Sequence, residues 1–403
     1  MRARELGIEI GLGEPGALNA ITDVAGVRVG CVTLIEGEPG PLVVGEGPVR
    51  TGVTVIVPHD GEISTEPLFA GCHTLNGAGD FTGLEWVRES GLLTSPIALT
   101  NTYSLGVVRD ALVRREVEAR AAARADATGD ATGADTPGVY FSFPVASETW
   151  DGCLNDVAGQ HVRATHVEQA LAAASGGPVP EGNVGGGTGM VCHDFKGGTG
   201  SASRVVEIAG VRYTVGVLAQ ANHSWRDVFC VNGVPVGLIL STDVVPGVQL
   251  PEYPWPTGGG SIVAILATDA PALPTHLASL ARRAGLGLAW LGGYGDRFSG
   301  DLFLAFSTAN RGIASQHEGA PGPPLHAAEW LALQHLDGLF QAAVEATAEA
   351  VLNALLQART MTGRDHVTAH ALDGEQLVQA LDRYGRRAFR PAAAAWGLPD
   401  VTG

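Results

Sequence analysis

The stretch Gly258-Gly-Gly-Ser-Ile-Val-Ala-Ile-Leu-Ala-Thr268 marks the sharpest change of character along the chain. Glycines precede Ser261, and the residues from Ser261 to Thr268 form an almost continuous apolar run. Such a run is typical of a strand that is buried on both faces. We therefore predict a fully buried strand over residues 261–268.

Helices and strands are predicted on both sides of this strand. Pro274 is expected to begin a helix that ends at Gly285, after two arginines. Further strands are expected at 53–57, 139–145, 302–309 and on either side of Gly210, and helices from residue 84 and at 104–123, 162–174 and 325–360, the last interrupted at Gly338. Residues 71–83 are predicted to be a turn-rich loop, and residues 125–138, of low complexity, an exposed flexible loop. Residues 224–258 contain much proline and little periodicity and are predicted to be a long exposed segment.

The amino-acid composition limits which classes of protein this chain can belong to. Of 403 residues, 45% are apolar and 56 are glycine, which suits a layered α/β fold with many tight turns. A formal net charge of −17 argues against a nucleic-acid partner, because phosphate binding needs a basic surface. Neither a basic amphipathic stretch nor a long apolar segment indicates a membrane. The 5 cysteines lack CxxC spacing, which fits reduced thiols in a cytoplasmic protein.

The common catalytic motifs are missing. Residues 183–204 are dense in glycine, but they contain no Gly-Lys-Ser/Thr and no convincing dinucleotide fingerprint. Close backbone packing around a site explains them better than a nucleotide. No HExxH or zinc-ligand spacing occurs among the 12 histidines, so no metal is expected, and no GxSxG elbow is present.

Gly260-Ser261 has two interpretations. A serine that follows glycines and begins a buried strand is usually only a turn residue. Alternatively, cleavage of the Gly260–Ser261 bond would give Ser261 a free α-amine, which could act as base for its own hydroxyl. From the residues alone, both interpretations stay open.

Longer motifs change this balance. The chain resembles the DmpA-like family of L-aminopeptidase/D-amidase-esterases, which includes the β-aminopeptidases. The resemblance runs from Ile21 to Arg364 and rests on Glu148-Thr-Trp-Asp-Gly-Cys-Leu-Asn-Asp156, Gly182-Asn-Val-Gly-Gly-Gly-Thr-Gly189, Lys196-Gly-Gly-Thr-Gly-Ser-Ala-Ser-Arg204, Val217-Leu-Ala-Gln-Ala-Asn222, Gly260-Ser261 and Ser299-Gly-Asp-Leu-Phe-Leu-Ala-Phe-Ser-Thr-Ala-Asn310.

The resemblance implies a four-layer αββα sandwich similar to that of the N-terminal-nucleophile hydrolases, with its own connectivity. It also implies a precursor that cleaves itself before a serine. Here the fragments would be 1–260, the large subunit, and 261–403, the small subunit, together forming one structural domain. Members of the family are usually homo-oligomers, so a homotetramer of processed heterodimers is expected.

The family's site residues carry over one by one. Ser261 matches the nucleophile, and Ser299 and Asp301 match the Ser-Gly-acid element that polarises its surroundings. Asn222 matches the amide donor of the oxyanion hole, and Glu148 matches the acid that pairs with the free amine of the substrate. Trp150 stands where family members often have tyrosine, so any role of that hydroxyl is lost or moved.

The sequence therefore predicts a serine aminopeptidase or amidase without cofactor that acts on short peptides, amides or esters with a free N-terminal amine. Two alternatives remain at this stage. One is an acyltransferase of the ornithine acetyltransferase type, although those enzymes cleave before threonine. The other is a non-catalytic binding protein, although such a protein would be expected to show a damaged site.

Overall fold

The computed structural model describes residues 1–128, 143–251, 260–313 and 325–389. Two main sheets lie at its centre. The six-stranded sheet has the order β4 (Leu92–Leu93), β3 (Leu68–Gly77), β12 (Gly300–Ser307), β11 (Ser261–Thr268), β10 (Val211–Asn222) and β9 (Gly198–Ile208). The four-stranded sheet has the order β1 (Arg28–Glu36), β2 (Val49–Val57), β5 (Ile97–Asn101) and β6 (Val145–Thr149). The pairs β11–β12 and β5–β6 are parallel, and the other pairs are antiparallel.

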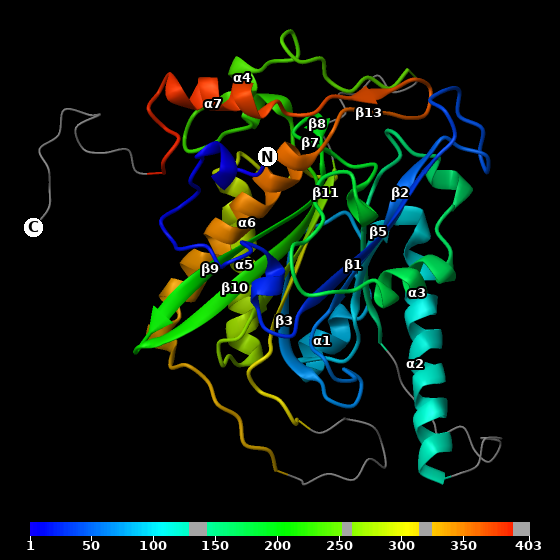
Figure 1. The fold of residues 1–403 in the computed structure, drawn as a ribbon, viewed down its shortest axis with the longest axis vertical. Helices are drawn as coiled ribbons and strands as arrows, with labels where there is room; N and C mark the ends of the chain where they lie inside the picture. The colour runs from blue at the N-terminus through cyan, green and yellow to red at the C-terminus, as the bar shows by residue number, and fades with distance from the viewer. Residues whose placement is uncertain (129–142, 252–259, 314–324, 390–403) are drawn as a thin grey trace, which may run out of the picture.

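Helices cover both outer faces of this pair of sheets (Figure 1). One outer layer contains α5 (Pro274–Trp290) and α6 (Asp337–Gln357), and the other contains α2 (Leu105–Thr128) and α3 (Ala164–Ala172). Smaller elements complete the chain: α1 (Leu84–Ser90), α4 (Val236–Ile239), α7 (Gly374–Asp382), β7 (Val191–Cys192), β8 (Phe195–Lys196), β13 (Met361–Thr362) and β14 (Thr368–Ala369).

Three buried apolar clusters separate the four layers. One joins α5 and α6 to the six-stranded sheet, a second lies between the two sheets, and a third joins α2 and α3 to the four-stranded sheet. Successive residues of β11 alternate between the first two clusters: Ile262 contributes to the helix side and Val263 to the space between the sheets. This explains why the β11 sequence is apolar without interruption, and the predicted αββα sandwich is confirmed.

Most predicted elements are present, and β11 covers the residues expected of it. The loop expected at 71–83 is wrong over residues 71–77, which belong to β3. Gly71 suits a strand here because α5 crosses it closely, and a Cβ at Gly71 would lie 2.2 Å from the backbone N of Ala278. Glycine at this position therefore indicates helix-on-sheet packing, not a turn.

The predicted ends of several helices also need correction. Helix α5 continues past Gly285 to Trp290, because its apolar face extends to the buried Leu288. Helix α6 begins only at Asp337, so residues 325–336 are not part of it. Residues 125–128 belong to α2, and the rest of the predicted 125–138 loop lies outside the described residues.

Two further expectations are revised. The strand expected at 139–145 runs over Val145–Thr149 instead, where it pairs with β5, while residues 139–142 are not described. The long exposed segment expected at 224–258 is wrong over residues 224–251, and residues 252–258 lie outside the described residues. The apolar side chains Phe229, Val231 and Val236 are fully buried in the cluster around α5 and α6, and the lack of periodicity reflects irregular backbone.

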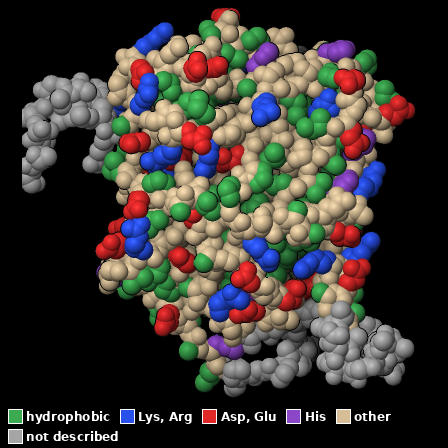
Figure 2. Space-filling model, in the orientation of Figure 1, with side chains coloured by type: hydrophobic (Ala, Val, Ile, Leu, Met, Phe, Trp, Pro, Cys, Tyr) green, Lys and Arg blue, Asp and Glu red, His purple; other side chains and the backbone are tan. Residues whose placement is uncertain are grey.

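On the face shown in Figure 2, acidic and basic side chains are interspersed. Among the described residues, α6 alone is long and apolar enough to cross a membrane, and 89% of its most apolar window is buried inside the protein. Because core helices of soluble proteins have the same composition, α6 is weak evidence for a membrane span.

Candidate active site

Adjacent strand ends bring the predicted site residues together. In the antiparallel pair of β10 and β11, Asn222 lies directly opposite Ser261. On the other side of β11, the parallel strand β12 begins at Gly300, between Ser299 and Asp301. Residues separated by more than 70 positions therefore converge at one edge of the six-stranded sheet.

Ser261 lies at the beginning of β11 and is almost fully buried, with 5% of its surface exposed. Its Oγ accepts a hydrogen bond of 2.9 Å from the backbone N–H of Gly300. This bond fixes the rotamer of Ser261 and leaves its hydroxyl proton free to go to a base. The arrangement suits a nucleophile whose oxygen is oriented by a backbone donor.

Gly260 is held against the strand that carries Asn222. A Cβ at Gly260 would lie 1.8 Å from the carbonyl oxygen of Asn222, a distance that no side chain tolerates. Only glycine therefore fits directly before Ser261. The peptide bond that joins Gly260 to Ser261 lies beside the predicted oxyanion donor.

The amide of Asn222 is fixed at both of its polar atoms. Its Oδ1 accepts a 2.7 Å hydrogen bond from the Val191 N–H, and its Nδ2 donates a 3.0 Å hydrogen bond to the Trp150 carbonyl. Because Nδ2 carries two protons, one remains for a substrate oxygen. A donor that is already oriented costs little reorganisation during the reaction.

Ser299 and Asp301 form a buried pair beside the nucleophile. Ser299 Oγ donates a 2.5 Å hydrogen bond to Asp301 Oδ1. Burial raises the pKa of Asp301 to about 6, an effect that the bond from Ser299 partly opposes. Raised carboxyl pKa values concentrate at functional sites, so this pair is a good candidate for the proton chemistry near Ser261.

Glu148 is the second buried carboxylate of this region and comes from β6 of the other sheet. Its Oε1 accepts a 2.9 Å hydrogen bond from the Asp80 N–H, and its Oε2 accepts one from the Thr102 hydroxyl. Burial raises the pKa of Glu148, against the lowering effect of these bonds. Within the described residues, no arginine or lysine forms an ion pair with Glu148.

Gly79 links Glu148 to the Ser261 region. A Cβ at Gly79 would lie 3.1 Å from Glu148 Oε1 and 3.3 Å from Gly300 Cα. Glu148 and the Gly300 amide that holds Ser261 thus flank the same glycine. A carboxylate in this position can pair with a substrate ammonium while the adjoining carbonyl lies near Ser261.

Trp150 contributes its backbone to the site. Its carbonyl accepts the bond from Asn222, and its half-buried indole packs with a cluster that includes Val191 and Met361. The contacts of the indole support a packing role for Trp150, which is the alternative to a substrate-binding role. Its role in binding substrate stays a prediction.

Sequence reasoning missed the groups that hold these side chains. They are the backbone N–H groups of Gly300 and Asp80 and the hydroxyl of Thr102. Backbone donors leave no mark in a sequence. Thr102, however, directly follows Asn101, whose side chain accepts bonds from the next turn, and that capping pattern could have drawn attention to it.

The sandwich and the serine at the beginning of its central strand define a serine aminopeptidase with a variant of the N-terminal-nucleophile hydrolase fold. The chain matches peptidase family S58 over residues 19–369 and belongs to that family. It is 45% identical to the β-peptidyl aminopeptidase BapA of Sphingosinicella microcystinivorans over 393 residues, which cover 96% of this chain and 93% of that protein.

Two solved structures are similar to the whole fold. A β-aminopeptidase from a Burkholderia species is 49% identical, with a TM-score of 0.84 and coverage of 96% of this chain and 99% of the other. The L-aminopeptidase D-Ala-esterase/amidase of Ochrobactrum anthropi is 40% identical, with the same TM-score and the same coverage. The predicted family and enzyme class are confirmed, and an acyltransferase or a non-catalytic binding protein is disfavoured.

Proposed function

We propose that this chain cleaves its own Gly260–Ser261 bond and then works as an N-terminal serine aminopeptidase with Ser261 as nucleophile. The observation that carries the proposal is the position of Ser261 opposite Asn222, with Gly260 held against the Asn222 carbonyl. One hydroxyl and one amide donor can thus act on the chain's own peptide bond and later on a substrate.

Self-cleavage would proceed as an acyl shift followed by hydrolysis. Ser261 Oγ attacks the carbonyl carbon of Gly260, the C–N bond breaks, and the hydroxyl proton passes to the departing nitrogen. Water then hydrolyses the ester, giving a carboxylate on Gly260 and a free α-amine on Ser261. The mature fragments would be 1–260 and 261–403.

The new α-amine is the proposed general base for turnover. It takes the proton of Ser261 Oγ as the oxygen attacks the substrate carbonyl, while Asn222 Nδ2 stabilises the oxyanion. The amine then returns the proton to the leaving group. Water hydrolyses the acyl-enzyme by the same route, with Ser261 as the leaving oxygen.

Glu148 would select substrates with a free N-terminal amine. Its carboxylate has backbone and hydroxyl donors but no cationic partner among the described residues, so an incoming ammonium would supply the missing charge. The names of the similar BapA and Burkholderia proteins favour β-aminoacyl substrates over L- or D-alanyl ones. Hydrolysis of β-alanyl, L-alanyl and D-alanyl p-nitroanilides would test this preference.

Intact mass and turnover of wild type and Ser261→Ala test the proposal. Wild type should give two fragments, the smaller beginning Ser261-Ile-Val-Ala, whereas Ser261→Ala should stay whole and inactive. A wild-type chain that is active without being cut, or a Ser261→Ala variant with normal turnover, would refute it.

The proposed assembly is a homotetramer of processed heterodimers. It rests on the resemblance to a family whose members are usually homo-oligomers. Light scattering of the purified protein would measure it directly.

A further inference from the structure

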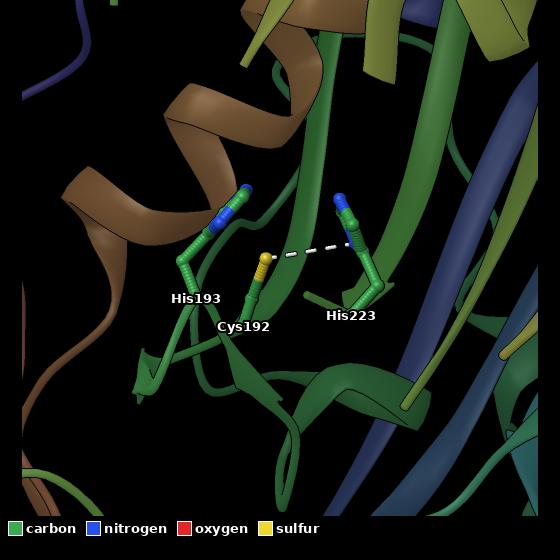
Figure 3. A group of neighbouring side chains, drawn as sticks. All are labelled: Cys192, His193 and His223. Carbon is green, nitrogen blue, oxygen red and sulfur yellow. Dashed lines mark hydrogen bonds between the residues drawn. The ribbon is translucent and has the colours of Figure 1, made fainter. Parts of the chain in front are cut away.

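A second cluster of reactive side chains lies behind the catalytic amide. Cys192 ends β7, His193 follows it in the turn to β8, and His223 follows Asn222 at the end of β10. In Figure 3 the cysteine lies between the two imidazoles, with its sulfur directed at His223. One ligand atom from each residue lies within 4.8 Å of the others.

All three side chains are buried, yet their hydrogen bonding is incomplete. Cys192 and His193 have no exposed surface, and His223 has 3%. The Nε2 atoms of both imidazoles lack a hydrogen-bond partner in the described structure. A buried polar atom without a partner costs free energy, so two of them in one cluster need an explanation.

The remaining contacts favour metal ligation. His193 Nδ1 lies 3.2 Å from the Trp225 carbonyl, which fixes the tautomer with the proton on Nδ1 and the lone pair on Nε2. A backbone carbonyl bound to the second ring nitrogen is the usual support of a metal-binding histidine.

Local charge selects the kind of ion. The Arg226 guanidinium donates to the His193 carbonyl at 3.1 Å, so one cation already lies beside the cluster. A divalent ion bound to one thiolate would leave a net positive charge beside this guanidinium. A monovalent ion would leave the site neutral. Because burying an unpaired charge costs free energy, the monovalent ion is favoured over the divalent one.

We propose that Cys192, His193 and His223 form a binding site for a soft monovalent d¹⁰ cation, with Cu(I) as the ion of that class. Thiolate and imidazole are ligands that suit Cu(I). On binding, the Cys192 thiol gives up its proton to solvent and a sulfur–copper bond forms, with no change of oxidation state. Neutral imidazoles fill the other two positions.

Binding would tighten the cluster. With metal–sulfur and metal–nitrogen distances of about 2.3 and 2.0 Å, a shared ion would draw in ligand atoms that now lie within 4.8 Å of one another. The two segments are already joined, because the His193 N–H donates to the His223 carbonyl at 2.8 Å. The site is therefore preformed in its backbone and needs mainly side-chain adjustment.

The test loads the purified, naturally processed protein with Cu(I) without oxygen, against a chromophoric Cu(I) chelator. A second sample is expressed in copper-supplemented medium, so that the ion can enter during folding. Native mass spectrometry should show one tightly held copper per chain. Cys192→Ser and His193→Phe should each weaken binding by more than about 100-fold, since even indirect partners of metal ligands change affinity by about 10–100-fold.

Cys153→Ser is the matched control, because Cys153 is a buried cysteine outside the cluster. It should keep the tightly held copper. The proposal fails if neither sample holds copper, if Cys153→Ser loses as much as Cys192→Ser, or if Zn²⁺ binds more tightly than Cu(I). Because the readout is metal content, it is independent of whether Ser261 is the nucleophile.

Discussion

Two groups of buried carboxylates in this molecule differ in what surrounds them. Glu345 and Glu349 of α6 both contact Arg204, with N–O distances of 3.1 and 2.6 Å, and all three side chains are buried. Glu148 and Asp301 are also buried, but in the described structure their partners are hydroxyls and backbone amides.

This difference separates carboxylates that stabilise the fold from carboxylates that can take part in the reaction. The α6 glutamates fix α6 to β9 and to the N-terminal segment, where Leu12 and Gly13 donate to Glu345. Burial without a cation raises the pKa of Glu148 and Asp301, which prepares them to meet a charged substrate or a proton. Removing the first group should cost stability, and removing the second should cost activity.

The largest effect is expected for Arg204→Met, which leaves Glu345 buried without a cation and leaves Glu349 with Arg4 as its remaining cation. Losing one partner of a buried ion pair typically costs about 3–5 kcal/mol of unfolding free energy. Chemical denaturation would measure it. Arg212→Met, which removes the exposed pair with Glu14, should leave the free energy of unfolding almost unchanged. Similar costs for both variants would contradict the structural role of Arg204.

Asn222→Ala should act mainly on catalysis, with some loss of stability because the Val191 N–H and the Trp150 carbonyl lose their partner. Removing one oxyanion donor typically lowers kcat by about 10²–10³-fold, because the donor matters most in the transition state. Steady-state kinetics with an aminoacyl p-nitroanilide would measure kcat and KM separately. A change confined to KM would place Asn222 in substrate binding instead.

Glu148→Gln should affect recognition of the substrate amine. The amide keeps the shape but loses the charge, and hydrogen bonds to charged groups contribute about 1.5–3 kcal/mol, or roughly 10- to 100-fold in KM. The comparison uses Ala and acetyl-Ala p-nitroanilides on wild type and variant. Equal hydrolysis of both compounds by wild type would remove the exopeptidase proposal.

The smallest effect concerns pH. Because Asp301 has a folded pKa of about 6, against 3.8 ordinarily, the folded protein binds more protons between these values. Its contribution to stability is therefore greatest at low pH and decreases as pH rises through about 6. Activity that needs the carboxylate should fall below pH 6, with an acid limb that Asp301→Asn removes. An unchanged limb in the variant's residual activity would assign it to another group.

The sequence by itself determined the family, the buried strand at 261–268 and the cores of most helices. Apolar periodicity is a local property, so a single chain can reveal it. The long motifs around Glu148, Asn222, Ser261 and Ser299 likewise carried the expected site residues without any geometry.

Only the tertiary structure decided what the ambiguous residues do. The sequence suggests a turn at Gly71, whereas in the structure Gly71 belongs to a strand on which α5 packs closely. The sequence suggests an exposed loop at Phe229, whereas Phe229 is buried in the core. Cys192 and His223 are 31 positions apart and meet only because β7 and the end of β10 lie together. The physical reason is that burial and pairing depend on which distant segments pack together, and local pattern does not encode those partners.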